Sequence, residues 1–390
     1  MPFLMVAAQT AIDETSKVIT VEKTPEVRLE QINPHPETGN DAVRPPQENP
    51  MQCALLINAA CEYKLTMSFP VPTSLHSNEV MIRNYATGLN PIDWKSLAYN
   101  FCLPQFPWIT GREMAGIVAR VGDAVTNCRV GDRVWTSTYY KDRRAGCFQD
   151  LVVVPEHTVA RIPAGLDFES AACLGVGALT AAMTLWKWMG IPMYPPPAVP
   201  STVARDDRGY VLIWGGSSVT GQFATQLAAL AHLHVIAVCS GQAAPVLRQL
   251  GAKHIVVRDG LSDAEIADAI RGIAGDDITR GIDLVGSKTA RTLLEVLSKS
   301  KPALLAPLAM MSSSTPVPDN VTVVGVEMKQ FVLDPSSKVY SSRLNELIED
   351  GHIQLPQIEV IKGGLAAVEG GLRRLKEGRA NGKKLVVSFT

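Results

Sequence analysis

The chain has 390 residues, of which 46% are hydrophobic and 19% charged, and its formal net charge is −1. This length allows two domains with sizeable cores. The near-neutral balance argues against a strong general attraction to nucleic acid or to an anionic membrane surface. No apolar run approaches the ~18–20 residues that a membrane helix needs, and the first residues lack the basic leader of a secretory signal. We therefore expect a cytoplasmic globular protein that spans no membrane.

The cysteines are odd in number and scattered, without the C-x-x-C spacing of zinc or redox sites. We expect all of them to be reduced and buried as small apolar side chains. They are Cys53, Cys61, Cys102, Cys128, Cys147, Cys173 and Cys239.

The first half of the chain divides into an extension and a β-rich module. Residues 1–50 accumulate Pro, Glu, Thr and Asn without periodicity, which predicts a flexible extension. From Met51 to about Arg161, short runs rich in Val, Ile and aromatic residues alternate with Gly, Pro and Asp, which predicts strands and turns. Two further apolar runs near the end, QIEVIKG and KKLVVSFT, resemble this module, so we expect residues 340–390 to complete it.

The second half of the chain alternates between helical and strand patterns. Helical spacing covers 168–189, and a Pro-rich connector follows at 193–202. Six short apolar runs with helical segments between them then predict an α/β fold with a doubly wound parallel six-stranded sheet of Rossmann type. The runs cover residues 210–214, 234–239, 254–258, 282–285, 303–308 and 321–328.

A Gly-rich turn joins the first of these strands to its helix in the stretch GYVLIWGGSSVTG, Gly209–Gly221. Small residues let the backbone approach a pyrophosphate, and the helix N-terminus offers free N–H groups to it. Such turns also occur for packing reasons, and Ser218 stands where the strict fingerprint has glycine. The candidate cofactor contacts are Gly215, Gly216, Ser217, Ser218, Val219, Thr220 and Gly221.

The end of the second strand distinguishes NAD from NADP. An NAD enzyme usually has an acidic residue there that binds the ribose 2′-hydroxyl. Here the strand ends Val238-Cys239-Ser240-Gly241, without an acid, which favours NADPH. Arg258, at the end of the third strand, is either a partner for the 2′-phosphate or a solvated charge.

Three further blocks offer polar groups in otherwise apolar surroundings. In Asn90–Lys95, NPIDWK, Pro91 ends a strand, Asp93 can cap the next turn, and Lys95 is either a surface lysine or a cofactor ligand. In Gly111–Gly116, the adjacent Arg112 and Glu113 can pair with each other. In Leu174–Thr180, the Thr180 hydroxyl can donate to a ligand or bond its own i−4 carbonyl.

Together and in this order, the blocks ATGLNPIDWKS, GREMAGIVARVGDAV, LGVGALTAA and LIWGGSSVTG resemble the medium-chain dehydrogenase/reductase superfamily from about Met51 to Thr390. Within it, the sequence is most similar to the trans-acting enoyl reductases of fungal highly reducing polyketide synthases. The resemblance implies a GroES-like catalytic domain over 51–190, completed by 340–390, and a Rossmann NADP-binding domain over 191–339.

The resemblance also implies an activity, the reduction by NADPH of an enoyl thioester carried by an acyl carrier protein. Lys95 and Thr180 would then line the nicotinamide end as the catalytic residues, with Pro91 and Asp93 beside them. Ser217–Thr220 would hold the pyrophosphate, and Ser240 and Arg258 the 2′-phosphate. The proton donor is left open between Tyr99, Tyr139, Tyr140 and solvent.

The same resemblance bears on metal, partners and assembly. Zinc-dependent members carry Cys and His where this chain has Asn90 and Arg112, so no metal is expected. The partner would be the carrier protein of a polyketide synthase, and the chain a monomer. Lys141, Arg143 and Arg144 are either a docking patch for that acidic partner or a solvated loop. The alternatives are a quinone or enone reductase acting on small diffusible substrates and a non-catalytic dinucleotide-binding protein.

Overall fold

The computed structural model describes residues 50–194 and 209–389. The predicted N-terminal extension lies outside these residues except for Pro50, and so does most of the predicted Pro-rich connector. The domain boundaries stay a prediction.

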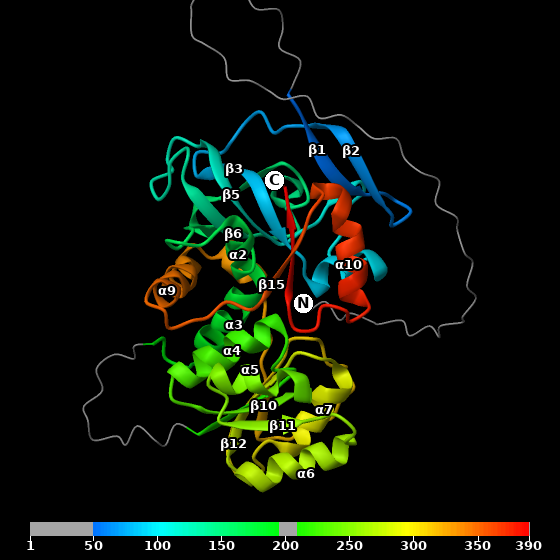
Figure 1. The fold of residues 1–390 in the computed structure, drawn as a ribbon, viewed down its shortest axis with the longest axis vertical. Helices are drawn as coiled ribbons and strands as arrows, with labels where there is room; N and C mark the ends of the chain where they lie inside the picture. Colours follow the sequence, from blue (N-terminus) through cyan, green and yellow to red (C-terminus); the bar gives the residue numbers. More distant parts are fainter. Residues whose placement is uncertain (1–49, 195–208, 390) are drawn as a thin grey trace, which may run out of the picture. The chain divides into compact units, whose positions relative to one another are not determined.

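The β-rich module contains two sheets (Figure 1). A three-stranded sheet has the order β2-β1-β4, and a seven-stranded sheet has the order β15-β16-β3-β5-β6-β8, with β7 paired to β3. β3 carries two neighbours on one edge, because its first half pairs with β7 and its last residues pair with β16. The last strands of the chain thus join the sheet of the β-rich module. The strands are β1 (Met51–Ile57), β2 (Tyr63–Pro70), β3 (Glu79–Gly88), β4 (Trp108–Ile109), β5 (Glu113–Val121), β6 (Arg133–Ser137), β7 (Leu151–Pro155), β8 (Val159–Arg161), β15 (Ile358–Ile361) and β16 (Lys384–Ser388).

The predicted parallel six-stranded sheet is confirmed. Its order is β11-β10-β9-β12-β13-β14, and every neighbouring pair is parallel. This is the strand order 3-2-1-4-5-6 of doubly wound dinucleotide-binding sheets. The sixth strand is shorter than the predicted run, ending at Val323. The strands are β9 (Tyr210–Trp214), β10 (His234–Cys239), β11 (His254–Val257), β12 (Ile278–Asp283), β13 (Ala303–Pro307) and β14 (Val321–Val323).

Each face of this sheet is covered by its own helices, because neighbouring strand residues point to opposite sides. Val211 and Ile213 pack in one core cluster with residues of α4 and α5. Leu212 and Trp214 pack in a second cluster with residues of α6 and α7. The helices are α4 (Val219–Leu230), α5 (Ala244–Gln249), α6 (Asp263–Ala274) and α7 (Ser287–Val296).

The remaining helices are α1 (Pro91–Ala98), α2 (Phe168–Ala171), α3 (Leu179–Met183), α8 (Lys329–Leu333), α9 (Lys338–Glu349) and α10 (Val368–Lys376). Of these, α3 packs against α4 beside the six-stranded sheet, and α10 packs against α1 at the β-rich module (Figure 1).

The predicted helix over 168–189 exists, but it is not regular. Two π-helical segments, Leu174–Ala178 and Thr184–Trp188, flank α3. By length and composition, Phe168–Trp188 could cross a membrane, contrary to our expectation that no stretch approaches that length. Most of it is buried against α4 in the core cluster that also covers the six-stranded sheet. Its apolar composition is thus explained by burial inside the protein.

Candidate functional site

The Gly-rich turn lies at the carboxyl ends of three neighbouring strands. The N–H groups of Gly215 and Gly216 both donate to the carbonyl of Val238 on β10, at 3.1 Å each. The N–H of Arg258, just after β11, donates to the carbonyl of Cys239 at 2.9 Å. The predicted contacts in the turn, Ser240 and Arg258 are therefore brought to one edge of the sheet, the edge where ligands bind in such folds.

The turn needs glycine for steric reasons. Gly215 has φ +85°, which side chains rarely adopt. A Cβ on Gly221 would lie 2.5 Å from the carbonyl oxygen of Gly215 and 2.6 Å from that of Gly216. Ser218 begins α4 as its N-cap, and its hydroxyl accepts the N–H of Gly221 at 3.1 Å. Ser217, Val219 and Thr220 are partly exposed around this helix start.

The ribose end of this edge carries an acid that the sequence did not indicate. The Asp259 carboxylate accepts the N–H of Gly241 at 2.8 Å, next to Ser240. No acid is expected at the end of the second strand, because the sequence of that strand contains none. This expectation is wrong, since the Asp259 carboxylate lies there in the folded protein. The reason is that the carboxylate comes from the loop after the third strand. Arg258 and Asp259 are both exposed.

α1 places the first polar block. It begins at Pro91, and the Asp93 carboxylate accepts the N–H of Asn90 at 2.9 Å, as the predicted cap requires. Asp93 is fully buried, and burial raises the pKa of its carboxyl to about 7 against the opposing charge of Arg112. Its side chain therefore supports α1 from inside the protein, and its predicted cofactor contact stays a prediction.

Lys95 lies two residues further along α1 and is half-buried. Its ammonium group is 5.8 Å from the centre of the Trp94 ring, and Lys376 of α10 lies at the same distance from that ring. Partial burial lowers the pKa of the Lys95 ammonium. Lys95 is thus placed on a short helix with a packed aromatic support.

A buried network that sequence reasoning missed is centred on Glu113, at the start of β5. Its side chain forms a buried ion pair with Lys384 of β16. Asn90 donates to the same carboxylate from its side-chain amide at 2.8 Å, and Val176 donates its backbone N–H at 2.7 Å. Lys384 also donates to the Asn90 side-chain oxygen at 2.8 Å. The resemblance included all these blocks, but nothing in their spacing showed that they meet.

Arg112 does not pair with its neighbour Glu113, contrary to that possibility, because Glu113 is held by Lys384, Asn90 and Val176. The Arg112 guanidinium lies 5.4 Å from the centre of the Tyr140 ring and is nearly fully buried. Tyr139 and Tyr140, two of the open choices for a proton donor, have ring centres 4.5 Å apart. Tyr99 is largely exposed near Trp94.

The third block lies directly against the Gly-rich turn. A Cβ on Gly177 would lie 2.6 Å from Cγ1 of Val219, the first residue of α4. Thr180 follows within the same helical stretch and is partly exposed. Its hydroxyl bonds no residue that the structure describes, including the Val176 carbonyl. Of the two alternatives for the Thr180 hydroxyl, a bond to a ligand or to its own i−4 carbonyl, the structure leaves it free for a ligand.

The chain segment before β16 reaches the turn from the other side. The Gln222 side-chain amide donates to the carbonyl of Ser217 at 2.9 Å and to that of Gly382 at 2.8 Å. Four sequence blocks and the C-terminal strand therefore converge at one place.

Comparisons with known proteins agree with this arrangement. Residues 76–164 match the alcohol dehydrogenase GroES-like domain family. A trans-enoyl reductase of Aspergillus sclerotiorum is 29% identical over 360 residues, covering 85% of this chain and 99% of the relative. The enoyl reductase component of the lovastatin nonaketide synthase of Aspergillus terreus is 26% identical over 378 residues, covering 90% and 98%. The chain is thus similar over most of its length to these reductases, in line with the resemblance to the medium-chain dehydrogenase/reductase superfamily.

Solved structures confirm the fold of this superfamily for the chain. A quinone oxidoreductase of Pseudomonas syringae superposes with a TM-score of 0.70 at 21% identity, covering 87% of this chain and 100% of that one. The CurK enoyl reductase gives the same TM-score and identity, covering 87% and 99%. These structures share the fold of the chain, and the fungal trans-enoyl reductases are its distant homologues.

The positions that hold zinc in other members of the superfamily are engaged by the protein itself. Asn90 is bound to Glu113 and Lys384, and the buried Arg112 guanidinium lies over the Tyr140 ring. Over 50–194 and 209–389, no three His, Cys, Asp or Glu side chains gather in a way that could hold a metal ion. The expectation of a metal-free site stays a prediction.

Two surface expectations need correction. Arg144 is not free for docking, because its guanidinium donates to Glu79 at 2.7 Å and 2.9 Å and to Asp142 at 2.8 Å. The seven cysteines are all free, but Cys53, Cys61 and Cys102 are only partly buried, since they lie near the surface of the β-rich module.

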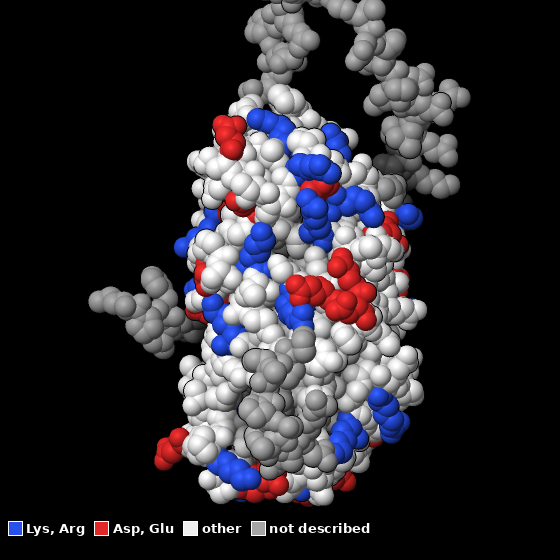
Figure 2. Space-filling view, turned by 90° about the vertical axis from the view of Figure 1, so that its left-hand side faces the viewer, with Lys and Arg blue, Asp and Glu red and all other residues white. Residues whose placement is uncertain are grey.

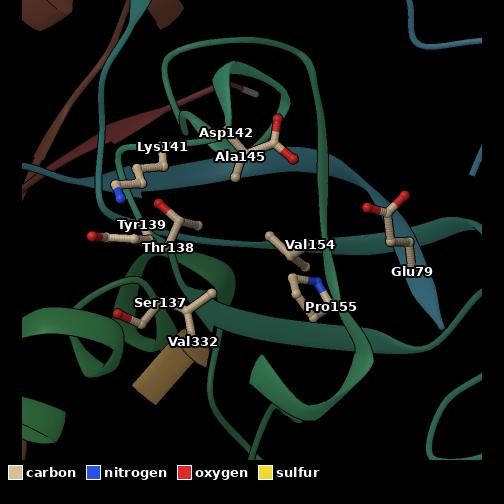
Figure 3. A pocket seen from close by; sticks show the side chains of 10 residues that line it. All are labelled: Glu79, Ser137, Thr138, Tyr139, Lys141, Asp142, Ala145, Val154, Pro155 and Val332. Atoms are coloured by element: carbon tan, nitrogen blue, oxygen red, sulfur yellow. The ribbon is translucent and has the colours of Figure 1, made fainter. Parts of the chain in front are cut away.

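A pocket of about 170 Å³ lies at one side of the β-rich module (Figure 3). Its wall includes Tyr139, Lys141, Val154 and Val332 of α8, and Val154 and Val332 point toward its centre. None of the predicted cofactor contacts lines it. It is therefore separate from the Gly-rich turn.

Proposed function

We propose that this chain is a trans-acting enoyl reductase that uses NADPH to reduce the α,β-double bond of an enoyl thioester carried by an acyl carrier protein. The distant homology to fungal trans-enoyl reductases supports the reaction, and the positions of Lys95, Thr180 and the Gly-rich turn support the site. We further propose that the protein acts as a monomer in the cytoplasm, with a polyketide synthase as a transient partner.

The residues present fit a nicotinamide dinucleotide. The backbone N–H groups at the start of α4 and the hydroxyls of Ser217 and Thr220, two partly exposed residues, suit a pyrophosphate. When bound, such a cofactor would supply a hydride for the β-carbon of the substrate. Negative charge then develops on the thioester oxygen, and the chain must stabilise it with hydrogen-bond donors.

Lys95 and Thr180 are the donors that we assign to this end of the site. The Lys95 ammonium is a donor on a packed helix, and the Thr180 hydroxyl is hydrogen-bonded to no described residue. Both groups can therefore donate to the ribose and the substrate oxygen. The α-carbon takes its proton from a tyrosine of the β-rich module or from solvent, which balances the reaction.

The single observation that carries the proposal is the Glu113 network. It binds Asn90, at the start of α1, and Val176, in the stretch that leads to Thr180. Gly177 in that stretch packs on Val219 at the Gly-rich turn. The elements that carry Lys95, Thr180 and the cofactor turn are therefore fixed to one another, as hydride transfer requires.

The surface is compatible with a transient carrier-protein partner. On the face shown in Figure 2, Lys and Arg side chains are spread mainly over the upper half with Asp and Glu among them, and most of the surface is uncharged. This interspersed pattern suits brief encounters better than tight electrostatic capture.

The second candidate is a quinone or enone reductase with small diffusible substrates. The solved quinone oxidoreductase favours it only through its shared fold. The two candidates differ in substrate, so the purified chain is mixed with NADPH and either a short enoyl thioester or a quinone while the absorbance of reduced nicotinamide is followed. Turnover of the thioester supports the proposal, and turnover of quinone alone contradicts it.

Lys95→Ala tests the site in the same assay. We expect it to lose at least 90% of thioester reduction, because a positioned general donor contributes about 10²-fold or more. Lys376→Ala is the matched control, since Lys376 packs at the same distance on the same tryptophan and is expected to leave the rate near that of the wild type. If both variants lose the same fraction of thioester reduction, the loss comes from disturbed packing on Trp94, and Lys95 has no role of its own in the reaction.

A further inference from the structure

We propose that Asp259 sets the cofactor preference of this reductase by placing a carboxylate where the 2′-phosphate of NADPH must bind. The inference rests on the proposed function only in assuming that a nicotinamide dinucleotide binds at the Gly-rich turn. It concerns a residue outside the four blocks that the sequence indicated.

Asp259 is held in place by two backbone features. The N–H of Arg258 is bonded to Cys239, which fixes the end of β11 beside the end of β10. The N–H of Leu261 then donates to the carbonyl of Arg258 at 3.1 Å, and Gly260 takes φ +76°, so the loop turns sharply after Asp259. This turn directs the carboxylate back onto Gly241.

The carboxylate binds a backbone N–H next to a residue that we assign to the cofactor. Its Oδ2 accepts the N–H of Gly241 at 2.8 Å, directly after Ser240. In dinucleotide-binding sheets the residues that follow the second strand contact the adenosine ribose. A 2′-phosphate placed here would meet the carboxylate, whereas a 2′-hydroxyl carries no charge.

Two cations oppose this acid. The charges of Arg248, on α5, and of Arg258 lower the pKa of the Cys239 thiol. The charge of Asp259 raises the pKa of the same thiol. Arg258 and Asp259 directly follow β11, whose end lies beside the end of β10, and Arg248 lies on the helix that connects these two strands. The arginines attract a phosphate and Asp259 repels it, so the balance among the three fixes the selectivity for NADPH over NADH.

The size of the repulsion can be bounded. Two unit charges 4 Å apart interact by about 1 kcal/mol in water, and a phosphate monoester carries ≈ −1.5 to −2 charges at neutral pH. Because Asp259 is exposed, screening reduces the effect. Neutralising it is expected to tighten NADPH binding about tenfold, and Asp259→Asn keeps an oxygen for the N–H of Gly241.

The experiment measures the dissociation constants of NADPH and NADH by fluorescence titration for the wild type, Asp259→Asn and Asp268→Asn. Asp268, on α6, is exposed and paired with Arg271, so it controls for net charge. We expect Asp259→Asn to tighten NADPH binding about tenfold at low salt and to leave NADH unchanged, with the difference shrinking in high salt. Asp268→Asn should alter neither constant.

Three results overturn the inference. NADPH binding that does not change shows that the carboxylate lies outside the phosphate site. A loss of NADH affinity alone shows that Asp259 binds a ribose hydroxyl instead. Equal changes for both cofactors show a structural effect. If the wild type binds neither cofactor, the proposed function fails, which is a separate outcome.

Discussion

Lys384→Met removes the cation from the buried network at Glu113. The Lys384 ammonium donates to the Leu89 carbonyl at 3.1 Å and to Asn90 at 2.8 Å besides pairing with Glu113, and it is 2% exposed. Methionine fills the space but leaves a buried carboxylate without its cation. Breaking one partner of a buried ion pair costs about 3–5 kcal/mol.

The structure narrows this range. The Glu113 carboxylate keeps two donors, the Asn90 amide and the Val176 N–H, so the loss in unfolding free energy should be near ~3 kcal/mol, the lower limit. Lys383→Met is the matched control on the neighbouring residue. Its ammonium lies 3.8 Å from Glu359 and is 37% exposed, so its loss should cost less than ~1 kcal/mol.

Urea unfolding at neutral pH, followed by tryptophan fluorescence, gives the comparison. Lys384→Met should shift the midpoint strongly and Lys383→Met little. Adding Glu113→Gln to Lys384→Met should recover most of the loss, because no buried charge then remains unpaired. The reasoning is refuted if Lys384→Met lies within ~1 kcal/mol of the wild type, or if the double variant is less stable than Lys384→Met.

Two further variants test the turn and the lysine. Gly221→Ala should lose about 1–3 kcal/mol of unfolding free energy and most NADPH affinity, since its Cβ meets two carbonyl oxygens. Gly272→Ala, in open space on α6, is the control and should be neutral or stabilising. If both variants lose the same stability and affinity, the steric requirement for Gly221 is refuted. Because burial lowers the pKa of Lys95, its ammonium loses its proton below the ordinary lysine value of about 10.4, so kcat/KM should fall with rising pH before that value. Lys95→Arg should move that decline to higher pH, and an unchanged pH profile would exclude Lys95 as its source.

Local patterns in the sequence predicted the elements well. Short apolar runs indicated all six parallel strands, although β12 (Ile278–Asp283) begins four residues before its predicted run, and small residues indicated the turn at Gly215–Gly221. The spacing of apolar residues along a segment indicates which of its side chains are buried. It therefore locates strands and helices without knowledge of the segments that pack against them.

Contacts between distant segments could not be predicted in the same way. Lys384 and Glu113 are 271 residues apart, and neither position shows its burial in its local pattern. Asp259 lies two residues beyond β11 and meets Gly241 only because β10 and β11 are neighbours. Arg144 was counted as a surface charge because nothing in the sequence indicated that Glu79 would bind it.

The position of Lys384 also sets the order in which the protein can be completed during synthesis. The six-stranded sheet and its turn are made before β16 emerges, yet the carboxylate of Glu113 receives its cation only from that strand. Domains fold as units while the chain is still being made, so an unfinished chain can hold a folded sheet beside an open, unneutralised site. The elements around Glu113 would therefore be fixed to one another only once β16 has emerged, and a chain that lacks Lys384 would lack this fixation despite an intact Gly-rich turn.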